Sequence, residues 1–392
     1  MLSKISGYTD PMRPPDRVSE LDGIRGIAIL LVMFFHFGSF VPNHPTLMYT
    51  TASQVLNFGW CGVDLFFVLS GFLITGRLLD SVGSQNYFSA FYVHRALRIL
   101  PVYYLAVFVF FEVVPVAPRW FGWDVPKISS TEQLWYWLHV SNWRTAFDPY
   151  VYPQVGHFWS LAIEEQFYLA WPLLVLTCSR RRLLQVCAGL ILVCWLARSL
   201  PPVQALSAQY PNLLYRLTPF RIDSLVFGAS AAVIVRDQWW TTRAQRCLRL
   251  VFVSGCIVIS AVVVVAGTTS TSSGPMTIFG YTALGMTFTC AVLYATWNAG
   301  SAGIGTRILR NSMLTSFGKY SYAMYVVHIS MMFIQIHMPP GHGSTPLTIL
   351  ARIGATYLVA VLSWICIERH FLRLKRLFPY RQISPIACAA TN

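Results

Sequence analysis

The sequence predicts an all-α membrane protein, a bundle of about ten transmembrane helices with both termini in the cytoplasm. Of its 392 residues, 55% are hydrophobic and only 11% are charged, and the mean hydropathy is +0.53. Soluble domains usually carry about a quarter charged residues. Apolar runs long enough to cross a hydrocarbon layer of about 30 Å recur along the chain, which favours a polytopic protein.

Ten such runs can be counted, and we expect each to form a transmembrane helix. The one long connection, residues 117–157, follows the third run and is rich in tryptophan. In chain order the runs are 24–41, 59–79, 99–116, 158–178, 183–200, 220–235, 248–267, 278–297, 320–337 and 347–367.

Basic residues are distributed unequally between the two sides of this predicted bundle. If the N-terminus is cytoplasmic, the connections on that side carry 20 Lys and Arg residues and those on the opposite side carry seven. This bias is typical of cytoplasmic loops and supports both the span count and the orientation. We therefore divide the chain into an N-terminal tail (1–16), a membrane domain (17–368) and a basic C-terminal tail (369–392).

The formal net charge of +14 does not indicate nucleic-acid binding, because no basic segment stands apart from the apolar runs. The nine cysteines lie mostly within or beside apolar runs and lack paired metal-ligand spacing. We expect neither a disulfide framework nor a metal site.

The first run contains two ionisable residues, Arg25 near its entry and His36, which we place near the membrane midplane. They are eleven positions apart, which is about three helical turns and ~16 Å, so they share one face. An ionisable group at that depth is costly unless a partner or a wet cavity receives it, and it is a functional candidate. The alternative is a histidine that only stabilises helix packing.

Three carboxylates inside later runs are further candidates. Asp64 lies in the second run, and Glu164 and Glu165 are adjacent in the fourth. Adjacent residues on a helix point about 100° apart, so both glutamates cannot face one site equally. Arg221 and Asp223 open the sixth run, where they form either a local ion pair or a substrate contact.

His328, in the ninth run, is expected to be a packing residue satisfied by the phenols of Tyr322 and Tyr325. Glu368, at the end of the last run, is expected to be structural. The tryptophans of the outer segment form either an interfacial belt or a platform for sugar faces. Trp159, at the start of the fourth run, is the substrate-binding candidate among the tryptophans.

Arg95 and Arg98 lie in the connection between the second and third runs. Their spacing of three places both on one helical face at the inner surface, where guanidinium groups can bind phosphate oxygens. Flanking arginines of a membrane span are the simpler alternative. The chain has no glycine-rich phosphate loop, so nothing supports ATP-driven chemistry.

Several motifs occur together and in order: LDGIRGIAILLVMFFHF, GVDLFFVLSGFLIT, HRALRILPVYY, HFWSLAIEEQFYLAWP, RIDSLVFG and SYAMYVVH. In this combination the chain resembles the acyltransferase-3 family of membrane O-acyltransferases, over roughly residues 17–368. The resemblance implies a ten-helix domain that moves an acyl group from cytosolic acyl-CoA to an acceptor hydroxyl at the outer face. It also implies that Arg25 and His36 form the family's R-x10-H pattern and that Arg95 and Arg98 form its RxxR pattern.

The extracytoplasmic esterase-like domain fused to some family members is not seen after Glu368, where a basic tail follows. An acceptor that needs such a second transfer domain is therefore not expected.

A hydroxyl attacking a thioester needs a base, and a neutral buried imidazole can accept the proton. Our hypothesis is that His36 is this base and that Glu165, Glu164 or Asp64 orients it. A variant has His36 carrying the acyl group as a covalent intermediate. Arg25, Arg95 and Arg98 would hold the phosphates of acyl-CoA, with no metal involved.

The sequence thus predicts an O-acyltransferase of the bacterial inner membrane, in contact with membrane lipids, that transfers an acyl group to an exported or cell-surface carbohydrate. Acetyl-CoA is the favoured donor, and the length of the acyl chain is open. An alternative acceptor is a glycolipid or a small secondary metabolite such as a macrolide. A different class, a transporter or glycan flippase, also places polar residues at mid-depth, although no two-half repeat is visible. The oligomeric state is open.

Overall fold

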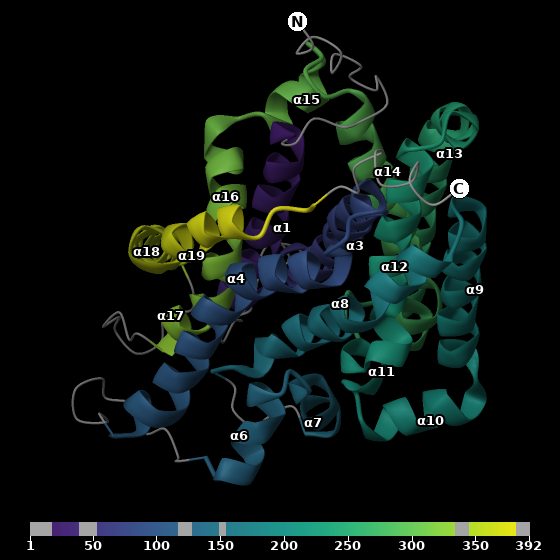
Figure 1. Ribbon diagram of the computed structural model, residues 1–392. Helices are drawn as coiled ribbons and strands as arrows, with labels where there is room; N and C mark the ends of the chain where they lie inside the picture. The colour runs from purple at the N-terminus through teal and green to yellow at the C-terminus, as the bar shows by residue number, and fades with distance from the viewer. Residues whose placement is uncertain (1–17, 39–52, 117–127, 149–153, 334–344, 382–392) are drawn as a thin grey trace, which may run out of the picture.

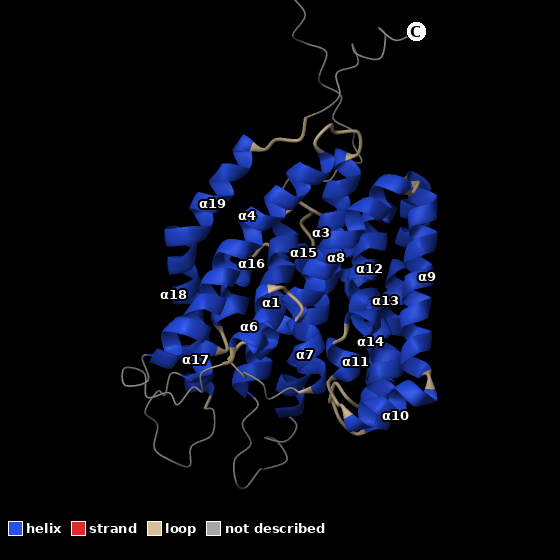
Figure 2. Ribbon diagram, turned by 60° about the horizontal axis from the view of Figure 1, so that its bottom comes forward, coloured by secondary structure: helices blue, strands red, loops and turns tan. Residues whose placement is uncertain are grey.

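The computed structural model describes residues 18–38, 53–116, 128–148, 154–333 and 345–381. Within these ranges the chain is almost entirely helical and contains no β-strand, which confirms the predicted all-α class. Figure 2 shows the long helices standing side by side as one bundle.

The long helices supply the body of the bundle. They are α1 (Ser19–Gly38), α3 (Gly62–Ser81), α4 (Tyr87–Phe108), α8 (Trp159–Thr177), α9 (Arg180–Ser199), α12 (Thr218–Val235), α13 (Gln238–Ala266), α14 (Tyr281–Trp297), α16 (Ser312–Val327) and α18 (Pro346–Ser363).

Shorter helices connect them (Figure 1). They are α6 (Ser130–Trp137), α7 (Ser141–Phe147), α10 (Pro201–Gln209), α11 (Leu213–Arg216), α15 (Ile304–Leu309), α17 (Ser330–Phe333) and α19 (Arg369–Leu374), with a π-helical turn η6 (Trp364–Glu368) before α19 and a 3-10 turn η7 (Lys375–Leu377) after it.

Eight helical segments of the described chain are long and apolar enough to cross a membrane. The two other expected spans, the fourth and the ninth, correspond to α8 and α16. Helix α8 carries Glu164, Glu165 and Gln166 in its middle, and α16 has only 16 residues. The count of ten crossings and the side on which the termini lie stay predictions.

One helix boundary corrects the sequence analysis. Helix α4 begins at Tyr87, not near residue 99, so Arg95 and Arg98 lie inside a helix and not in a connection. Polar residues occupy the first turns of α4, and hydropathy leaves them out. Helix α1 is described from Ser19 to Gly38, with His36 near the end of that range, and the depth of His36 in the membrane stays a prediction.

Glycines allow two pairs of helices to touch at their backbones. A Cβ built on Gly71 of α3 would lie 1.8 Å from the carbonyl oxygen of Leu225 in α12, and one on Gly228 would lie 1.8 Å from that of Val68. A Cβ on Gly318 of α16 would lie 1.8 Å from the carbonyl oxygen of Asp22 in α1. Small residues permit such close approach in membrane bundles. The close approach of α3 to α12, and of α1 to α16, therefore depends on glycine at these positions.

The α3–α12 contact encloses a network of fully buried charges. Arg221 donates to Asp64 over 2.6 Å, and Ser224 donates to the same Asp64 oxygen over 2.8 Å. Asp223 pairs with Arg198 of α9 over 2.8 Å. Of the two alternatives for Arg221 and Asp223, the local ion pair is therefore wrong, because each residue pairs with a different helix.

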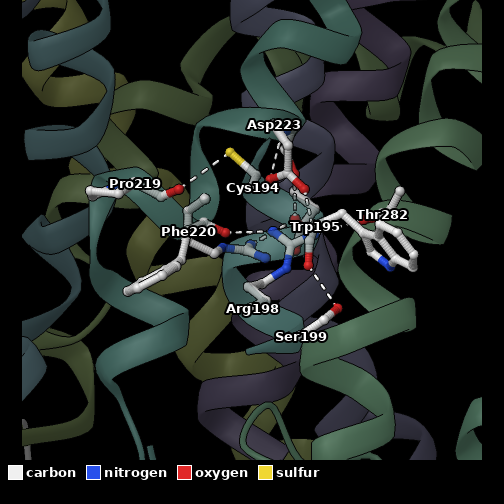
Figure 3. A network of polar contacts seen from close by, with 11 residues as sticks. Cys194, Trp195, Arg198, Ser199, Pro219, Phe220, Asp223 and Thr282 are labelled. Atoms are coloured by element: carbon white, nitrogen blue, oxygen red, sulfur yellow. Dashed lines mark hydrogen bonds and ion pairs between the residues drawn. The ribbon is translucent and has the colours of Figure 1, made fainter. Parts of the chain in front are cut away.

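Arg198 lies at the centre of the part of this network that contains Asp223 (Figure 3). Its guanidinium donates to the carbonyl oxygen of Phe220 and to the hydroxyl of Thr282 in α14, each over 2.6 Å. The side chain of Arg198 is completely buried. The network joins α3, α9, α12 and α14.

Candidate active site

A cavity of about 370 Å³ lies between α1, α3, α4, α8 and α16, and we call it the arginine cavity. Its lining includes five arginines and three carboxylates. The arginines are Arg25, Arg77, Arg95, Arg98 and Arg236, and the carboxylates are Asp22, Asp80 and Glu164. The cavity thus brings together all three arginines that the sequence assigned to the donor.

The carboxylates do not neutralise all of these arginines. Arg25 pairs with Asp22 over 2.9 Å and Arg236 pairs with Asp80 over 2.8 Å. Arg98 approaches Glu368 only to 3.8 Å, so Glu368 has the structural contact expected of it. Arg77 and Arg95 form no ion pair with any described residue. The cavity therefore has an excess of positive charge, which suits an anionic ligand.

The two adjacent glutamates of α8 have different surroundings. Glu164 lines the arginine cavity and accepts a hydrogen bond of 2.8 Å from the hydroxyl of Tyr168. That hydroxyl also bonds to Ser70 of α3. Glu165 is not part of the lining, and its Oε1 atom is buried without a hydrogen-bond partner among the described residues. Of these two candidate acids, Glu164 is the one at the cavity.

A histidine cluster, His36, His157 and His328, lies next to Tyr325, which lines the cavity. Nδ1 of His36 lies 3.3 Å from Nε2 of His328. The ring centroids of His36 and His328, and those of His157 and His328, are each 4.8 Å apart. These residues come from α1, from the segment before α8 and from the end of α16, so the fold unites three distant parts of the sequence.

Backbone carbonyl groups determine which ring nitrogens carry hydrogen. Nδ1 of His36 lies 2.8 Å from the carbonyl oxygen of Val32, and Nδ1 of His328 lies 2.7 Å from that of Tyr325. A carbonyl oxygen only accepts, so each Nδ1 is the donor. In the neutral ring Nε2 then carries a lone pair. For His36 this leaves Nε2 as the atom that can accept a proton.

Tyr325 separates the arginine cavity from the histidine cluster. Its side chain lines the cavity, its hydroxyl bonds to Ser160 over 2.5 Å, and its ring packs 5.4 Å from that of His328. His36 does not line the cavity. The arginine cavity and the histidine cluster are therefore neighbours, because the Tyr325 side chain contacts both.

Sequence reasoning missed the roles of two histidines. We expected phenols to satisfy His328, but its ring nitrogens contact His36 and a backbone carbonyl. His157, whose Nε2 lies 3.2 Å from the carbonyl oxygen of Val326, was not a candidate at all. The available signal for His157 was its position directly before the fourth apolar run, while the position of His328 inside the ninth run gave no sign of its partner.

Asp64, Glu164 and Glu165 were the expected orienting acids, yet none of them is hydrogen-bonded to His36 in the described chain. Trp159 is buried against Tyr215, with ring centroids 4.7 Å apart, and does not reach the cavity lining. Trp120 and Trp123 of the outer segment lie outside the described residues. Among those residues no group of three His, Cys, Asp or Glu side chains could hold a metal ion.

The acyltransferase-3 family model, described as an acyltransferase domain, matches residues 18–368. The chain belongs to the acyltransferase-3 family. This match confirms the resemblance of the sequence motifs and spans every element that lines the arginine cavity. It ends at Glu368, so α19 and η7 lie beyond the family's common region.

Similar curated proteins are O-acetyltransferases by name. A putative peptidoglycan O-acetyltransferase of Bacillus subtilis (strain 168) is 32% identical over 232 residues, 55% of this chain and 33% of that protein. The peptidoglycan O-acetyltransferase of Listeria monocytogenes is 30% identical over 238 residues, 55% of this chain and 34% of that protein. A putative O-acetyltransferase of Staphylococcus aureus (strain COL) is 31% identical over 184 residues, 45% of this chain and 27% of that protein.

The matched region spans about a third of the length of these relatives. No solved structure matches the chain.

Proposed function

We propose that this protein is an integral membrane O-acyltransferase that moves an acetyl group from cytosolic acetyl-CoA to a hydroxyl of an exported or cell-surface carbohydrate. The observation that carries the proposal is the arginine cavity with a histidine cluster behind it. Family membership supplies the reaction class. The donor, the acceptor and the location in a bacterial inner membrane are parts of the proposal.

The charge of the arginine cavity supports a CoA thioester as donor. Arg77 and Arg95 have no carboxylate partner within the described residues, and Arg98 has only a distant one at 3.8 Å. Guanidinium groups bind phosphate oxygens in a bidentate way. With its phosphates at these arginines, CoA would direct its thioester toward Ser160 and Tyr325 at the deep end.

His36 is suited to act as the base. The hydroxyl of the acceptor gives its proton to Nε2 of His36 while its oxygen attacks the thioester carbonyl. The C–S bond then breaks, and the departing CoA thiolate takes the proton from the imidazolium. The products are the acetyl ester and free CoA thiol, and His36 is neutral again.

Two groups orient the His36 ring, the imidazole of His328 and the backbone carbonyl of Val32. Neither is a carboxylate. Val32 accepts from Nδ1 of His36, and Nε2 of His328 faces the same atom. These contacts fix the tautomer in which Nε2 is free. Because Tyr325 stands between the cavity and this pair, the mechanism requires the Tyr325 side chain to move when donor is bound.

A carbohydrate acceptor is supported by the names of the relatives, two of which are named for peptidoglycan O-acetylation. Glycolipids and small metabolites are the alternatives. Mass spectrometry of surface glycans, glycolipids and secreted metabolites, with and without the protein, would distinguish them. A loss of the acetyl mass increment from glycans alone is expected, and a loss confined to another fraction would refute the carbohydrate acceptor.

The reaction class can be tested with purified protein in nanodiscs, supplied with acetyl-CoA and an extract of cell-envelope glycans. We expect release of CoA thiol that depends on both protein and extract. A transporter or flippase would move its substrate without breaking the thioester. Absence of protein-dependent thiol release with an extract whose glycans the cell does acetylate would contradict the proposal.

A further inference from the structure

The arginine cavity has a charged end and an apolar end, and α3 runs from one to the other. Near the end of α3, Arg77 and Asp80 line the cavity, and near its start Val63 and Phe66 line it. Arg77 and Phe66 are eleven positions apart. This separation corresponds to about 16 Å along an α-helix. A ligand that reaches from one end to the other must therefore be elongated.

The two ends also differ in exposure. Arg77 and Asp80 are exposed. At the other end Val63, Phe67 and Tyr325, which all line the cavity, are at most 6% exposed. The charged end is therefore the mouth of the cavity, and the apolar end is closed by side chains. This arrangement suits a ligand with anionic groups at one end and a small apolar group at the other.

Phe66 and Tyr325 together form a bulky part of the closed end. Their rings pack edge-on, with centroids 6.1 Å apart. The Tyr325 hydroxyl bonds to Ser160 over 2.5 Å and donates to the carbonyl oxygen of His157 over 3.1 Å. Phe66 is only half-buried, although it lies in a helix whose neighbouring residues are buried. The end group of an elongated ligand would therefore contact the Phe66 ring.

The backbone that carries Phe66 is held on both sides and cannot withdraw. A Cβ built on Gly62, one turn earlier, would lie 2.5 Å from the carbonyl oxygen of Ala28 in α1. Gly71, five positions later, is in close contact with α12. Moving this part of α3 would disrupt packing against two helices. Because the proposed mechanism requires Tyr325 to move, Phe66 is the fixed boundary of the closed end.

We propose that Phe66 limits the length of the acyl group, so that the site accepts an acetyl group and excludes longer straight-chain acyl groups. This inference rests on the proposed function for the identity of the donor, and it assigns the acyl selectivity of that donor site to one side chain. With the phosphates of the thioester held at the mouth, each added methylene would press the acyl end against the Phe66 ring. One methylene more or less in an apolar pocket changes kcat/KM by about 10- to 200-fold.

The test is the kcat/KM of the full chain in nanodiscs for acetyl-CoA, propionyl-CoA and butyryl-CoA, with the glycan extract as acceptor. Phe66→Ala removes the ring, and Phe66→Leu, which keeps an apolar side chain, is the second variant in case Phe66→Ala does not fold. Leu73→Ala is the matched control. Leu73 is another half-buried apolar residue of α3 that lines the cavity, but it lies four positions from Arg77 and so nearer to the mouth.

We expect the unmodified protein to prefer acetyl-CoA over butyryl-CoA by about 100-fold, because two methylenes are excluded. Phe66→Ala should reduce this preference about tenfold or more, and Phe66→Leu should reduce it by a smaller factor. Leu73→Ala should change kcat/KM for all three thioesters by the same factor, which leaves the preference as it is.

Three results would overturn the inference. The first is an unmodified protein that uses butyryl-CoA as efficiently as acetyl-CoA. The second is an equal preference in Phe66→Ala and Leu73→Ala. The third, if Phe66→Ala does not fold, is a Phe66→Leu protein with the preference of the unmodified protein.

Failure of the proposed function would look different. If the unmodified protein released CoA thiol from none of the three thioesters, the donor assignment would be wrong and the inference would fall with it. If the protein used acetyl-CoA and the Phe66 variants kept its preference, only the inference would be wrong.

Discussion

Nε2 of His328 lies 3.3 Å from Nδ1 of His36, although 292 residues separate them. The pairing depends on the close contact between α1 and α16 that Gly318 permits. Since Nδ1 of each ring also faces a backbone carbonyl, both tautomers are determined. The pair holds the His36 ring with its basic nitrogen, Nε2, directed away from its own helix contacts.

His328 should therefore matter for the rate of transfer and not for donor binding. We expect His328→Leu, which keeps the volume of the side chain, to lower kcat about 10- to 100-fold while the donor KM changes little, because the His36 ring loses its orientation. Steady-state kinetics with acetyl-CoA measures both constants.

A double variant separates this role from simple packing. If His328 acts through His36, adding His328→Leu to His36→Ala should cause no further loss of activity. Independent, multiplicative losses would show that His328 does not work through His36.

Asp64 should be needed for stability. It lies with Arg221 in a fully buried ion pair, and removing one partner leaves a buried charge unpaired. We expect Asp64→Asn to cost about 3–5 kcal/mol of unfolding free energy. Glu132→Gln, which breaks the part-exposed pair with Arg144, should cost less than about 1 kcal/mol.

Thermal unfolding in detergent measures both variants. If Asp64→Asn kept the melting temperature of the unmodified protein but lost acyl transfer, Asp64 would be a chemical group and the structural assignment would be wrong.

The α3–α12 contact should tolerate no side chain at Gly71. An added methyl group would meet the Leu225 carbonyl oxygen at 1.8 Å, so the two helices would have to separate and the Asp64–Arg221 pair would be strained. We expect Gly71→Ala to destabilise the protein by about 1–3 kcal/mol. Gly189 of α9 has no atom within 4 Å of its added Cβ and is the matched control.

Gly189→Ala should instead be neutral or stabilising by up to about 1 kcal/mol, because alanine favours helix. Equal melting temperatures for the two variants would contradict the close approach of α3 and α12.

The sequence predicted the helical class and much of the arginine cavity for a clear physical reason. Hydrophobic runs report which segments enter the bilayer, and a spacing of three places Arg95 and Arg98 on one face of a helix, which α4 provides. These are local properties of the chain. The helix limits were less certain, because polar residues in the first half of α4 hide its true start at Tyr87.

The partners of buried groups could not be predicted in the same way. Arg221 pairs with Asp64 of α3, and Asp223 pairs with Arg198 of α9, although Arg221 and Asp223 are two positions apart. Spacing shows which side of a helix a residue occupies but not which helix lies opposite. The His36–His328 contact was missed for the same reason.

Arg95 should contribute to donor binding. It lines the cavity without an ion pair to any described residue, so removing it should cost interaction with the donor and not a structural bond. We expect Arg95→Ala to raise the KM for acetyl-CoA about tenfold or more, with a smaller change in kcat. Arg243→Ala is the control, because exposed Arg243 only stacks on Trp239.

An unchanged KM in Arg95→Ala would place the phosphates of the donor elsewhere. The effect should also shrink as the ionic strength rises, since it is electrostatic at a partly open site.

The most direct test is acyl transfer from labelled acetyl-CoA by purified His36→Ala protein in nanodiscs, compared with His370→Ala, which removes an exposed histidine of α19. The account predicts that His36→Ala binds CoA normally but transfers acetyl groups about 10²- to 10⁴-fold more slowly, while His370→Ala behaves as the unmodified protein. Transfer at the unmodified rate by folded His36→Ala protein would contradict it.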